Sequence, residues 1–235
     1  MGRPPIFKRG AMTDAERQRR RRRKAKREKG IAARKAERDE RIARVASRET
    51  AISARIIAMP IKRYGVVYAD CEWSFEPYSR VTGMSRAADN HYPTSPTRMI
   101  MERDVPSICA PDSILYLWAT VPMLLDALAV MARWGFTYKS HAIWFKQRPG
   151  NGRGTGYWFT GEHELLLVGT KGKVPAPAMG TQSRSVIIAP VGAHSAKPDA
   201  VLEMIERYHP TLPKIELNRR GPARAGWDAW GNEAE

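Results

Sequence analysis

Apolar residues are patterned differently in two parts of the chain. From residue 64 onward, short and nearly continuous apolar runs alternate with segments whose apolar residues recur at helical spacing. Unbroken apolar runs are typical of strands covered on both faces of a sheet. The predicted strands are "YGVVYAD", "SILYLWAT", "SHAIWFK", "ELLLVGT", "SVIIA" and "KIELN", at residues 64–70, 113–120, 140–146, 164–170, 185–189 and 214–218.

Two amphipathic segments, residues 123–135 and 197–209, are predicted helices between those strands. The first stops at Gly135, and the second has Pro198 in its first turn and ends before Pro210, as helices commonly do. Strands that alternate with helices predict an open, mostly parallel α/β sheet, which binds ligands at the carboxyl ends of its strands. The polar residues that follow strands are therefore candidate ligand-binding residues: Asp70, Thr120, Lys146 and Asn218.

The first quarter of the chain lacks a core pattern. Residues 13–56 contain one glycine and no proline and are rich in the good helix formers Arg, Lys, Ala and Glu. Their apolar residues are too sparse for a buried stripe. We expect a solvated helix, or a segment that becomes helical on binding, as an arm over residues 1–62 ahead of a domain over residues 63–235.

Positive charge is concentrated in this arm. The 235-residue chain carries a net charge of +16, and residues 1–63 hold 22 Lys and Arg against 7 Asp and Glu. Such a density favours sequence-independent contact with nucleic-acid phosphates, because bound phosphates release their counterions. The alternative is a solubilising or targeting tail, since charge runs are often only solvated. The residues expected to contact the phosphate backbone are Arg19, Arg20, Arg21, Arg22, Arg23 and Lys24.

Several classes of protein are disfavoured. The two cysteines, Cys71 and Cys109, form neither a disulfide framework nor zinc-ligand spacing, and no metal site is predicted. No apolar run approaches the roughly 18 residues of a membrane span, and the start of the chain lacks a signal-peptide core, so we expect a soluble cytoplasmic protein without a membrane partner. Neither G-x-G-x-x-G nor G-x-x-x-x-G-K-[ST] occurs, which argues against a nicotinamide enzyme and a nucleotide triphosphatase.

The end of the first predicted strand, "YADCEWSF", offers a specific chemistry. Asp70 alone would most simply cap a turn. Together with the carbonyl of Cys71 and the ring of Trp73, it could hold an amine attached to a flat ring. The two oxygens would accept the N–H bonds of the amine, and the indole would stack on the ring. Positioning of this kind makes a delocalised amine more nucleophilic without a metal or a covalent intermediate.

This stretch resembles the D-P-P-W motif of adenine-N6 methyltransferases of the MT-A type. Further segments follow in the family's order across residues 64–233: "LYLWAT", "WGF", "IWFK", "GTGYW", "HELLLVGTKG", "HSAKPD", "IEL" and "GWDAWGNE". The resemblance implies a Rossmann-like methyltransferase sheet with helices on both faces, preceded by the basic arm. It also implies S-adenosyl-L-methionine as cofactor and methyl transfer to adenine N6 in nucleic acid. DNA is favoured over RNA because the compact single chain looks like the bacterial or phage branch.

The resemblance further implies roles for individual residues. The residues at the target amine would be Asp70, Cys71 and Trp73. The cofactor-binding residues would be Lys197, Glu216, Asn218, Arg219, Asn232 and Glu233. The target-base pocket would include Tyr92, Trp144 and Lys146, and Arg153 in a glycine-rich loop would contact the nucleic-acid backbone. Simpler interpretations exist: Trp144 as a core residue, Lys197 as a surface lysine, and Glu216 as the ion-pair partner of Arg219.

The family motif has prolines where this chain has Cys71 and Glu72. Cys71 keeps a carbonyl acceptor but lacks the ring that stiffens the turn, and Glu72 could either help to hold a cationic cofactor or repel phosphate. Two alternatives therefore stay open beside the adenine methyltransferase. One is a nucleic-acid-binding protein with impaired catalysis, and the other is methylation of a different amine, such as glutamine or cytosine. Both a monomer and a homodimer are compatible with the sequence.

Overall fold

The computed structural model describes residues 14–54, 59–73, 95–148, 150, 158–192, 196–231 and 233–234. The chain divides into two compact units, Met1–Ala54 and Arg55–Glu235. None of the helices in the described part of the chain is both long and apolar enough to cross a membrane.

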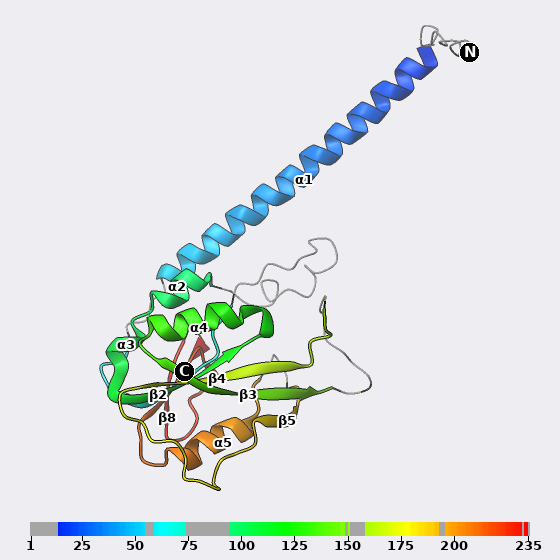
Figure 1. The fold of residues 1–235 in the computed structure, drawn as a ribbon. Helices are drawn as coiled ribbons and strands as arrows, with labels where there is room; N and C mark the ends of the chain where they lie inside the picture. The colour runs from blue at the N-terminus through cyan, green and yellow to red at the C-terminus, as the bar shows by residue number, and fades with distance from the viewer. Residues whose placement is uncertain are drawn as a thin grey trace, which may run out of the picture. The chain divides into compact units, whose positions relative to one another are not determined.

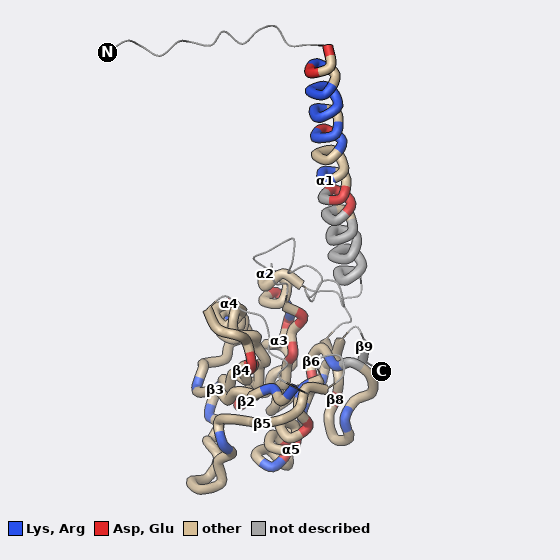
Figure 2. The backbone as a smooth tube through the Cα atoms, turned by 90° about the vertical axis from the view of Figure 1, so that its right-hand side faces the viewer, with Lys and Arg blue, Asp and Glu red and all other residues tan. Residues whose placement is uncertain are grey.

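The first unit is built around one long helix, α1 (Asp14–Ala54). The side chains of residues 14–37 are all exposed, and Lys and Arg dominate the early turns of the helix (Figure 2). Asp14 and Glu16 lie in the first turn, where negative charge interacts favourably with the helix dipole. Arg17 pairs with Asp14 at 2.9 Å, and Lys24 lies 3.8 Å from Glu28. The helix expected in the arm is therefore present over Asp14–Ala54.

The second unit contains a seven-stranded sheet with the strand order β5-β3-β4-β2-β1-β6-β8. The pairs β1–β2, β1–β6, β3–β5 and β6–β8 are parallel, whereas β4 is antiparallel to both of its neighbours. This confirms the mostly parallel sheet. The strands are β1 (Tyr64–Ala69), β2 (Cys109–Ala119), β3 (Thr137–Gln147), β4 (His163–Lys171), β5 (Val186–Pro190), β6 (Lys214–Leu217) and β8 (Trp227–Trp230), with a separate small pair of β7 (Arg220–Gly221) and β9 (Glu233–Ala234).

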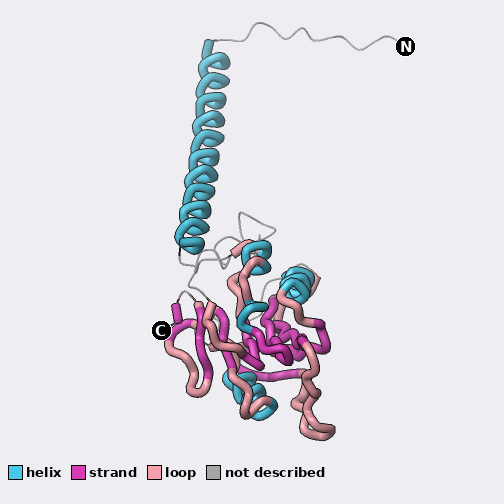
Figure 3. Tube along the Cα trace, turned by 90° about the vertical axis from the view of Figure 1, so that its left-hand side faces the viewer, coloured by secondary structure: helices cyan, strands magenta, loops and turns pink. Residues whose placement is uncertain are grey.

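Helices pack on both faces of the sheet (Figures 1 and 3). Side chains of β2 alternate between the faces: Leu115 and Leu117 join the core cluster that contains α4, and Tyr116 and Trp118 join the cluster that contains α5. The Rossmann-like arrangement implied by the family resemblance is therefore confirmed. The helices of this unit are α2 (Thr97–Met101), α3 (Val105–Ile108), the 3-10 turn η3 (Val121–Met123), α4 (Leu124–Arg133) and α5 (Asp199–Tyr208).

All six strands predicted from the sequence exist, but the strand β8 was missed. The segment "WDAW" is four residues long and pairs only with β6 at the edge of the sheet. Only its first residue, Trp227, is buried, so it has no run of apolar residues that would mark a strand. The short helices α2 and α3 were missed for a similar reason, because five and four residues are too few to show a helical period.

The buried core predicts that truncating two leucines will cost very different amounts of stability. Leu117 is fully buried in β2, whereas Leu125 on α4 is 79% exposed. We expect Leu117→Ala to lower the free energy of unfolding by about 2–5 kcal/mol, because it removes buried methyl groups and leaves a cavity. Leu125→Ala, the matched control, should change it by less than about 0.5 kcal/mol. Urea unfolding of both variants tests this, and equal losses would contradict the assigned core.

Candidate active site

The carboxyl ends of the central strands bring several polar residues to one edge of the sheet. Ala69 at the end of β1 is in register with Leu217 of β6 and Leu117 of β2, so Asp70 and Asn218 follow neighbouring strand ends. Because β4 runs in the opposite direction, its first residues lie at this same edge, and Ala119 is paired with Leu165. Glu164 is thereby placed beside the strand ends that the sequence singled out.

Four side chains of alternating charge form a continuous chain at this edge. The Lys197 ammonium lies 2.8 Å from a carboxylate oxygen of Asp70 and 3.2 Å from one of Glu164. The other oxygen of Glu164 is 2.5 Å from the ammonium of Lys146. Lys197 and Glu164 are 10% and 9% exposed, whereas Asp70 is 38% exposed. Asp70 is therefore the member of the cluster that is most open to solvent.

Mutual pairing keeps the two most buried of these groups charged. Burial alone would lower the pKa of Lys197, but the carboxylates of Asp70 and Glu164 outweigh it and raise that pKa above its ordinary value. Burial alone would raise the pKa of Glu164, but the ammonium groups of Lys197 and Lys146 bring it below the usual range. Charged groups in such a site are retained only because each has a partner.

Aromatic rings lie beneath the two lysines. The ammonium of Lys197 is 5.6 Å from the ring centre of Trp118, and that of Lys146 is 5.0 Å from the ring centre of Trp144, within the range of cation–π attraction. The two indoles meet edge to face, with their centres 6.0 Å apart. Trp144 is fully buried and donates its indole N–H to the carbonyl of Ala189 at 3.0 Å, so its ring supports the lysine from within the core.

The turn after β1 is tightly closed. The backbone N–H of Trp73 donates to the carbonyl of Cys71 at 2.9 Å, and the Trp73 indole N–H donates to the carbonyl of Trp118 at 3.1 Å. The Trp73 side chain is 7% exposed and so anchors the turn in the core. Burial raises the pKa of the Cys71 thiol well above its ordinary value. A protonated, buried thiol is not a nucleophile, which leaves the backbone carbonyl as the chemically useful group of this residue.

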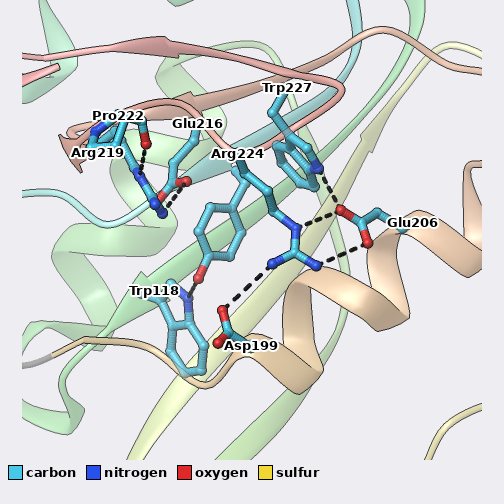
Figure 4. A network of polar contacts seen from close by, with 9 residues as sticks. Trp118, Asp199, Glu206, Glu216, Arg219, Pro222, Arg224 and Trp227 are labelled. Atoms are coloured by element: carbon cyan, nitrogen blue, oxygen red, sulfur yellow. Dashed lines mark hydrogen bonds and ion pairs between the residues drawn. The ribbon is translucent and has the colours of Figure 1, made fainter. Parts of the chain in front are cut away.

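A second polar group lies at the carboxyl end of β6. Arg219 pairs with Glu216 at 3.0 Å, as the simpler interpretation of Glu216 anticipated, and burial raises the pKa of Glu216. The Arg219 side chain also donates to the carbonyl of Pro222 at 3.1 Å. Figure 4 shows how Arg224 then fastens the following loop to α5, through contacts of 2.7 Å to Glu206 and 3.6 Å to Asp199.

The structure therefore gathers most of the residues singled out from the sequence. Asp70, Cys71, Trp73 and Lys197 lie in direct contact or in one turn. Glu216 lies near the end of the neighbouring strand β6, and Asn218 and Arg219 follow that strand. Tyr92, Arg153 and Asn232 lie outside the described residues, and Glu233 belongs to β9. Among the described residues, no three His, Cys, Asp or Glu side chains gather as a metal site would require.

Sequence reasoning missed two residues that this site depends on. Glu164 had one usable signal, because it is a charged residue at the start of an otherwise apolar strand. Arg103, in the turn after α2, contacts the carboxylate of Glu72. It had no such signal, because nothing in "MERDVP" distinguishes it from a surface arginine.

A charged edge on a doubly covered, mostly parallel sheet without a dinucleotide fingerprint fits a Rossmann-like methyltransferase. Residues 64–233 match the MT-A70 family model, and the chain belongs to the MT-A70 family. It is 36% identical over 190 residues to the type II methyltransferase M.MunI of Mycoplasma sp, a match that covers 74% of this chain and 79% of that protein.

Eukaryotic relatives are similar over the same part of the chain. Identity is 32% over 179 residues to an MT-A70-like N(6)-adenosine-methyltransferase of Arabidopsis thaliana, covering 72% of this chain and 24% of that protein. It is 30% over 181 residues to the N(6)-adenosine-methyltransferase catalytic subunit METTL3 of Homo sapiens, covering 74% and 28%. The match therefore spans only about a quarter of these two longer proteins.

The buried charge cluster predicts a pH-dependent contribution to stability. Glu164→Gln leaves two lysines short of a partner, and we expect it to lower the free energy of unfolding by about 3–5 kcal/mol at pH 7. The pKa of Glu164 is lowered in the folded state, so its contribution is present above its ordinary value of 4.5 and is lost as the pH falls below it.

Thermal unfolding between pH 3 and pH 7 measures this. The difference between wild type and Glu164→Gln should narrow in acid. Glu102→Gln is the control, because Glu102 is 63% exposed in a 3.9 Å pair with Arg98 and should cause little change at any pH. A difference that is constant across the range would contradict the pairing of Glu164.

Proposed function

We propose that this chain is an S-adenosylmethionine-dependent methyltransferase that transfers a methyl group to the N6 amino group of adenine in nucleic acid. The observation that carries the proposal is the turn Asp70–Cys71–Glu72–Trp73 at the end of β1 in a chain of the MT-A70 family. It presents a partly exposed carboxylate and a backbone carbonyl in consecutive residues. These are the two acceptors that a flat amino group requires.

The chain's residues fit the proposed cofactor, which supplies an electrophilic methyl group on a sulfonium sulfur. The ammonium of Lys197 is charged and beside Asp70, and it would hydrogen-bond an acceptor of the cofactor. The carboxylate of Glu216, on the neighbouring strand β6, would accept hydrogen bonds from ribose hydroxyls. Asn218 and Arg219 would complete that edge, together with Asn232 and Glu233.

The proposed chemistry depends on holding the amine rather than on covalent catalysis. An aspartate at neutral pH is only an acceptor, and a carbonyl oxygen has two lone pairs. The Cys71 carbonyl can therefore accept an N–H from the substrate while it keeps the bond from the Trp73 backbone. Two acceptors draw the amino nitrogen toward tetrahedral geometry, which localises its lone pair for attack. Asp70 is also the acceptor that the site offers for the proton that the nitrogen then loses.

DNA is the proposed substrate. Identity is 36% to the type II methyltransferase M.MunI, against 32% and 30% to the adenosine methyltransferases of Arabidopsis thaliana and Homo sapiens, and this favours DNA over RNA. The target base would be flipped from the duplex or taken from a single strand. Helix α1, with its exposed arginines, would add contacts with the phosphate backbone.

Asp70→Ala should strongly impair methyl transfer while cofactor binding remains measurable. Losing one of two preorganised acceptors should lower kcat on the order of 10²–10³-fold. The measurement is transfer from labelled S-adenosylmethionine to duplex and single-stranded DNA and to RNA, with the products separated as nucleosides. Asp112→Ala is the control, because it removes the same charge from an exposed residue. Asp112 lies near the start of β2, at the end of the strand away from Asp70. Activity retained by Asp70→Ala would remove Asp70 from its assigned role.

The same assay decides between the proposal and its alternatives. N6-methyladenine from the wild type establishes the enzyme, and a different methylated nucleoside identifies another amine as the target. If the wild type yields no product but Cys71→Pro does, the chain is a nucleic-acid-binding protein with a disabled catalytic turn.

The arm should provide salt-dependent affinity. Replacing Arg19, Arg20, Arg21, Arg22, Arg23 and Lys24 by glutamine, also a good helix former, should weaken binding to a mixed-sequence duplex. It should also reduce the slope of log affinity against log salt by up to about 5. Fluorescence anisotropy from 50 to 300 mM salt measures both quantities. An unchanged slope would show that these residues make no phosphate contacts.

A further inference from the structure

The carboxylate of Glu72, two residues after Asp70, is engaged by three side chains. One oxygen accepts from the hydroxyl of Ser95 at 2.6 Å and from the guanidinium of Arg103. The other accepts from the side-chain amide of Asn218. Arg103 also donates to the amide oxygen of Asn218 at 3.1 Å. Glu72, Arg103 and Asn218 therefore form a closed triangle, in which each side chain contacts the other two.

Backbone bonds hold Glu72 in the same place. Glu72 is the central residue of the turn closed by the 2.9 Å bond from the Trp73 N–H to the Cys71 carbonyl, a three-residue turn. Its own carbonyl accepts from the backbone N–H of Ser95 at 2.8 Å. The side chain of Glu72 therefore fixes the middle of the turn whose first carbonyl is proposed to grip the target amine.

The partners of Glu72 belong to the neighbouring strand ends. Asn218 follows β6 and has a positive φ of 66°, a left-handed conformation that asparagine adopts more readily than most residues other than glycine. Its N–H donates to the carbonyl of Trp230 at 2.6 Å, and a Cβ on Gly231 would lie only 2.9 Å from its Cα. Arg103 lies over the ring of Trp230 at 5.6 Å. The Glu72 carboxylate thus links the ends of β1 and β6 directly, and it reaches β8 through Arg103 and Asn218.

This network is poorly explained as a source of stability. Glu72 and Arg103 are each 14% exposed, and burial alone would raise the pKa of Glu72. The Arg103 guanidinium and the hydrogen bonds from Arg103 and Ser95 outweigh burial, so that pKa lies below its usual range. A buried ion pair contributes little net stability relative to apolar residues of similar volume, because desolvation offsets the attraction. What a fully bonded pair does provide is a fixed geometry.

We propose that Glu72 is a positioning residue for methyl transfer. Held by Arg103 and Asn218, it keeps the turn in the conformation in which the Asp70 carboxylate and the Cys71 carbonyl face the target amine together. Its contacts restrict the turn conformation, as the proline rings of a D-P-P-W motif do by fixing φ. It also couples this turn to Asn218, and hence to the edge proposed to bind the cofactor. This inference rests on the proposed methyltransferase function.

In this proposal Glu72 does not contact the cofactor directly. Both of its carboxylate oxygens accept from protein donors, so its negative charge is engaged within the protein and is not directed at a sulfonium or a phosphate. Asp70 has a different partner, Lys197. Two carboxylates separated by one residue therefore divide the tasks: Asp70 faces the proposed substrate, and Glu72 fixes the turn.

The test compares three variants with the wild type. Glu72→Ala removes the network. A triple variant, Cys71→Pro with Glu72→Pro and Arg103→Met, restores the proline motif and leaves no buried guanidinium without a partner. Arg98→Met is the matched control, because Arg98 is 84% exposed and its ion pair with Glu102 is 3.9 Å long. For each protein, kcat and KM are measured for methyl transfer to DNA, and the affinity for S-adenosylhomocysteine is measured by calorimetry.

We expect a specific split between rate and affinity. Glu72→Ala should lower kcat about 10- to 100-fold, because small misplacement of a reacting group is costly, with little change in the KM for DNA. It should weaken S-adenosylhomocysteine binding about tenfold, because Asn218 loses a charged partner. The triple variant should recover kcat to within about tenfold of wild type, while its weak cofactor affinity remains. If Glu72 only stabilised the fold, the triple variant would not recover kcat without also recovering its affinity for S-adenosylhomocysteine. Arg98→Met should match the wild type in all of them.

Three results would overturn the proposal: a wild-type kcat in Glu72→Ala, a folded triple variant whose kcat is as low as that of Glu72→Ala, or recovery of kcat and cofactor affinity together. If Glu72→Ala does not fold, the kcat of the triple variant decides. Failure of the proposed function is distinct, because the wild type would then methylate no nucleic acid. In that case the coupling is judged by S-adenosylhomocysteine affinity alone, and equal affinities of Glu72→Ala and wild type would overturn it.

Discussion

Compensation of buried charge at the end of β1 is the constraint on which the rest of the site depends. The ammonium of Lys197 is only 10% exposed, and it is tolerated there because Asp70 and Glu164 lie within 3.2 Å. The segment before α5, the end of β1 and the start of β4 must therefore converge. The reversed direction of β4 makes this possible, because a parallel strand would have placed Glu164 at the far edge of the sheet.

The turn that carries Asp70 is braced from two sides. On one side Asp70 contacts Lys197, which precedes α5 on one face of the sheet. On the other side Glu72 contacts Arg103 and Asn218, which belong to the turn after α2 and to the end of β6. Short loops at strand ends are usually the most variable parts of a fold. Here ion pairs and hydrogen bonds replace the rigidity that a proline-containing turn has from its own covalent geometry.

Much of this architecture was predictable from the sequence, and the reason is physical. Strands buried on both faces must be apolar throughout, so runs such as "LYLWA" can be recognised as strands in the sequence. Asp70 can be recognised as a strand-end residue because it follows such a run. Lys197 and Asp70 were assigned to one site through the family resemblance, and they lie in contact in the structure. Arg103 and Glu164 were not predictable as partners, because pairing across the fold leaves no trace in local spacing. The strand β8 was missed because an edge strand with one buried residue lacks a pattern.

The burial of Cys71 has a consequence for the redox behaviour of the protein. A cysteine beside charged, partly exposed residues can be a liability, since peroxide attacks thiolates that are accessible to solvent. The side chain of Cys71 is only 4% exposed, and its pKa is raised by burial, so almost none of it is thiolate and little of it can be reached. The turn therefore carries sulfur in place of a proline ring without becoming a sensor of oxidants, and alkylating reagents should leave its chemistry intact.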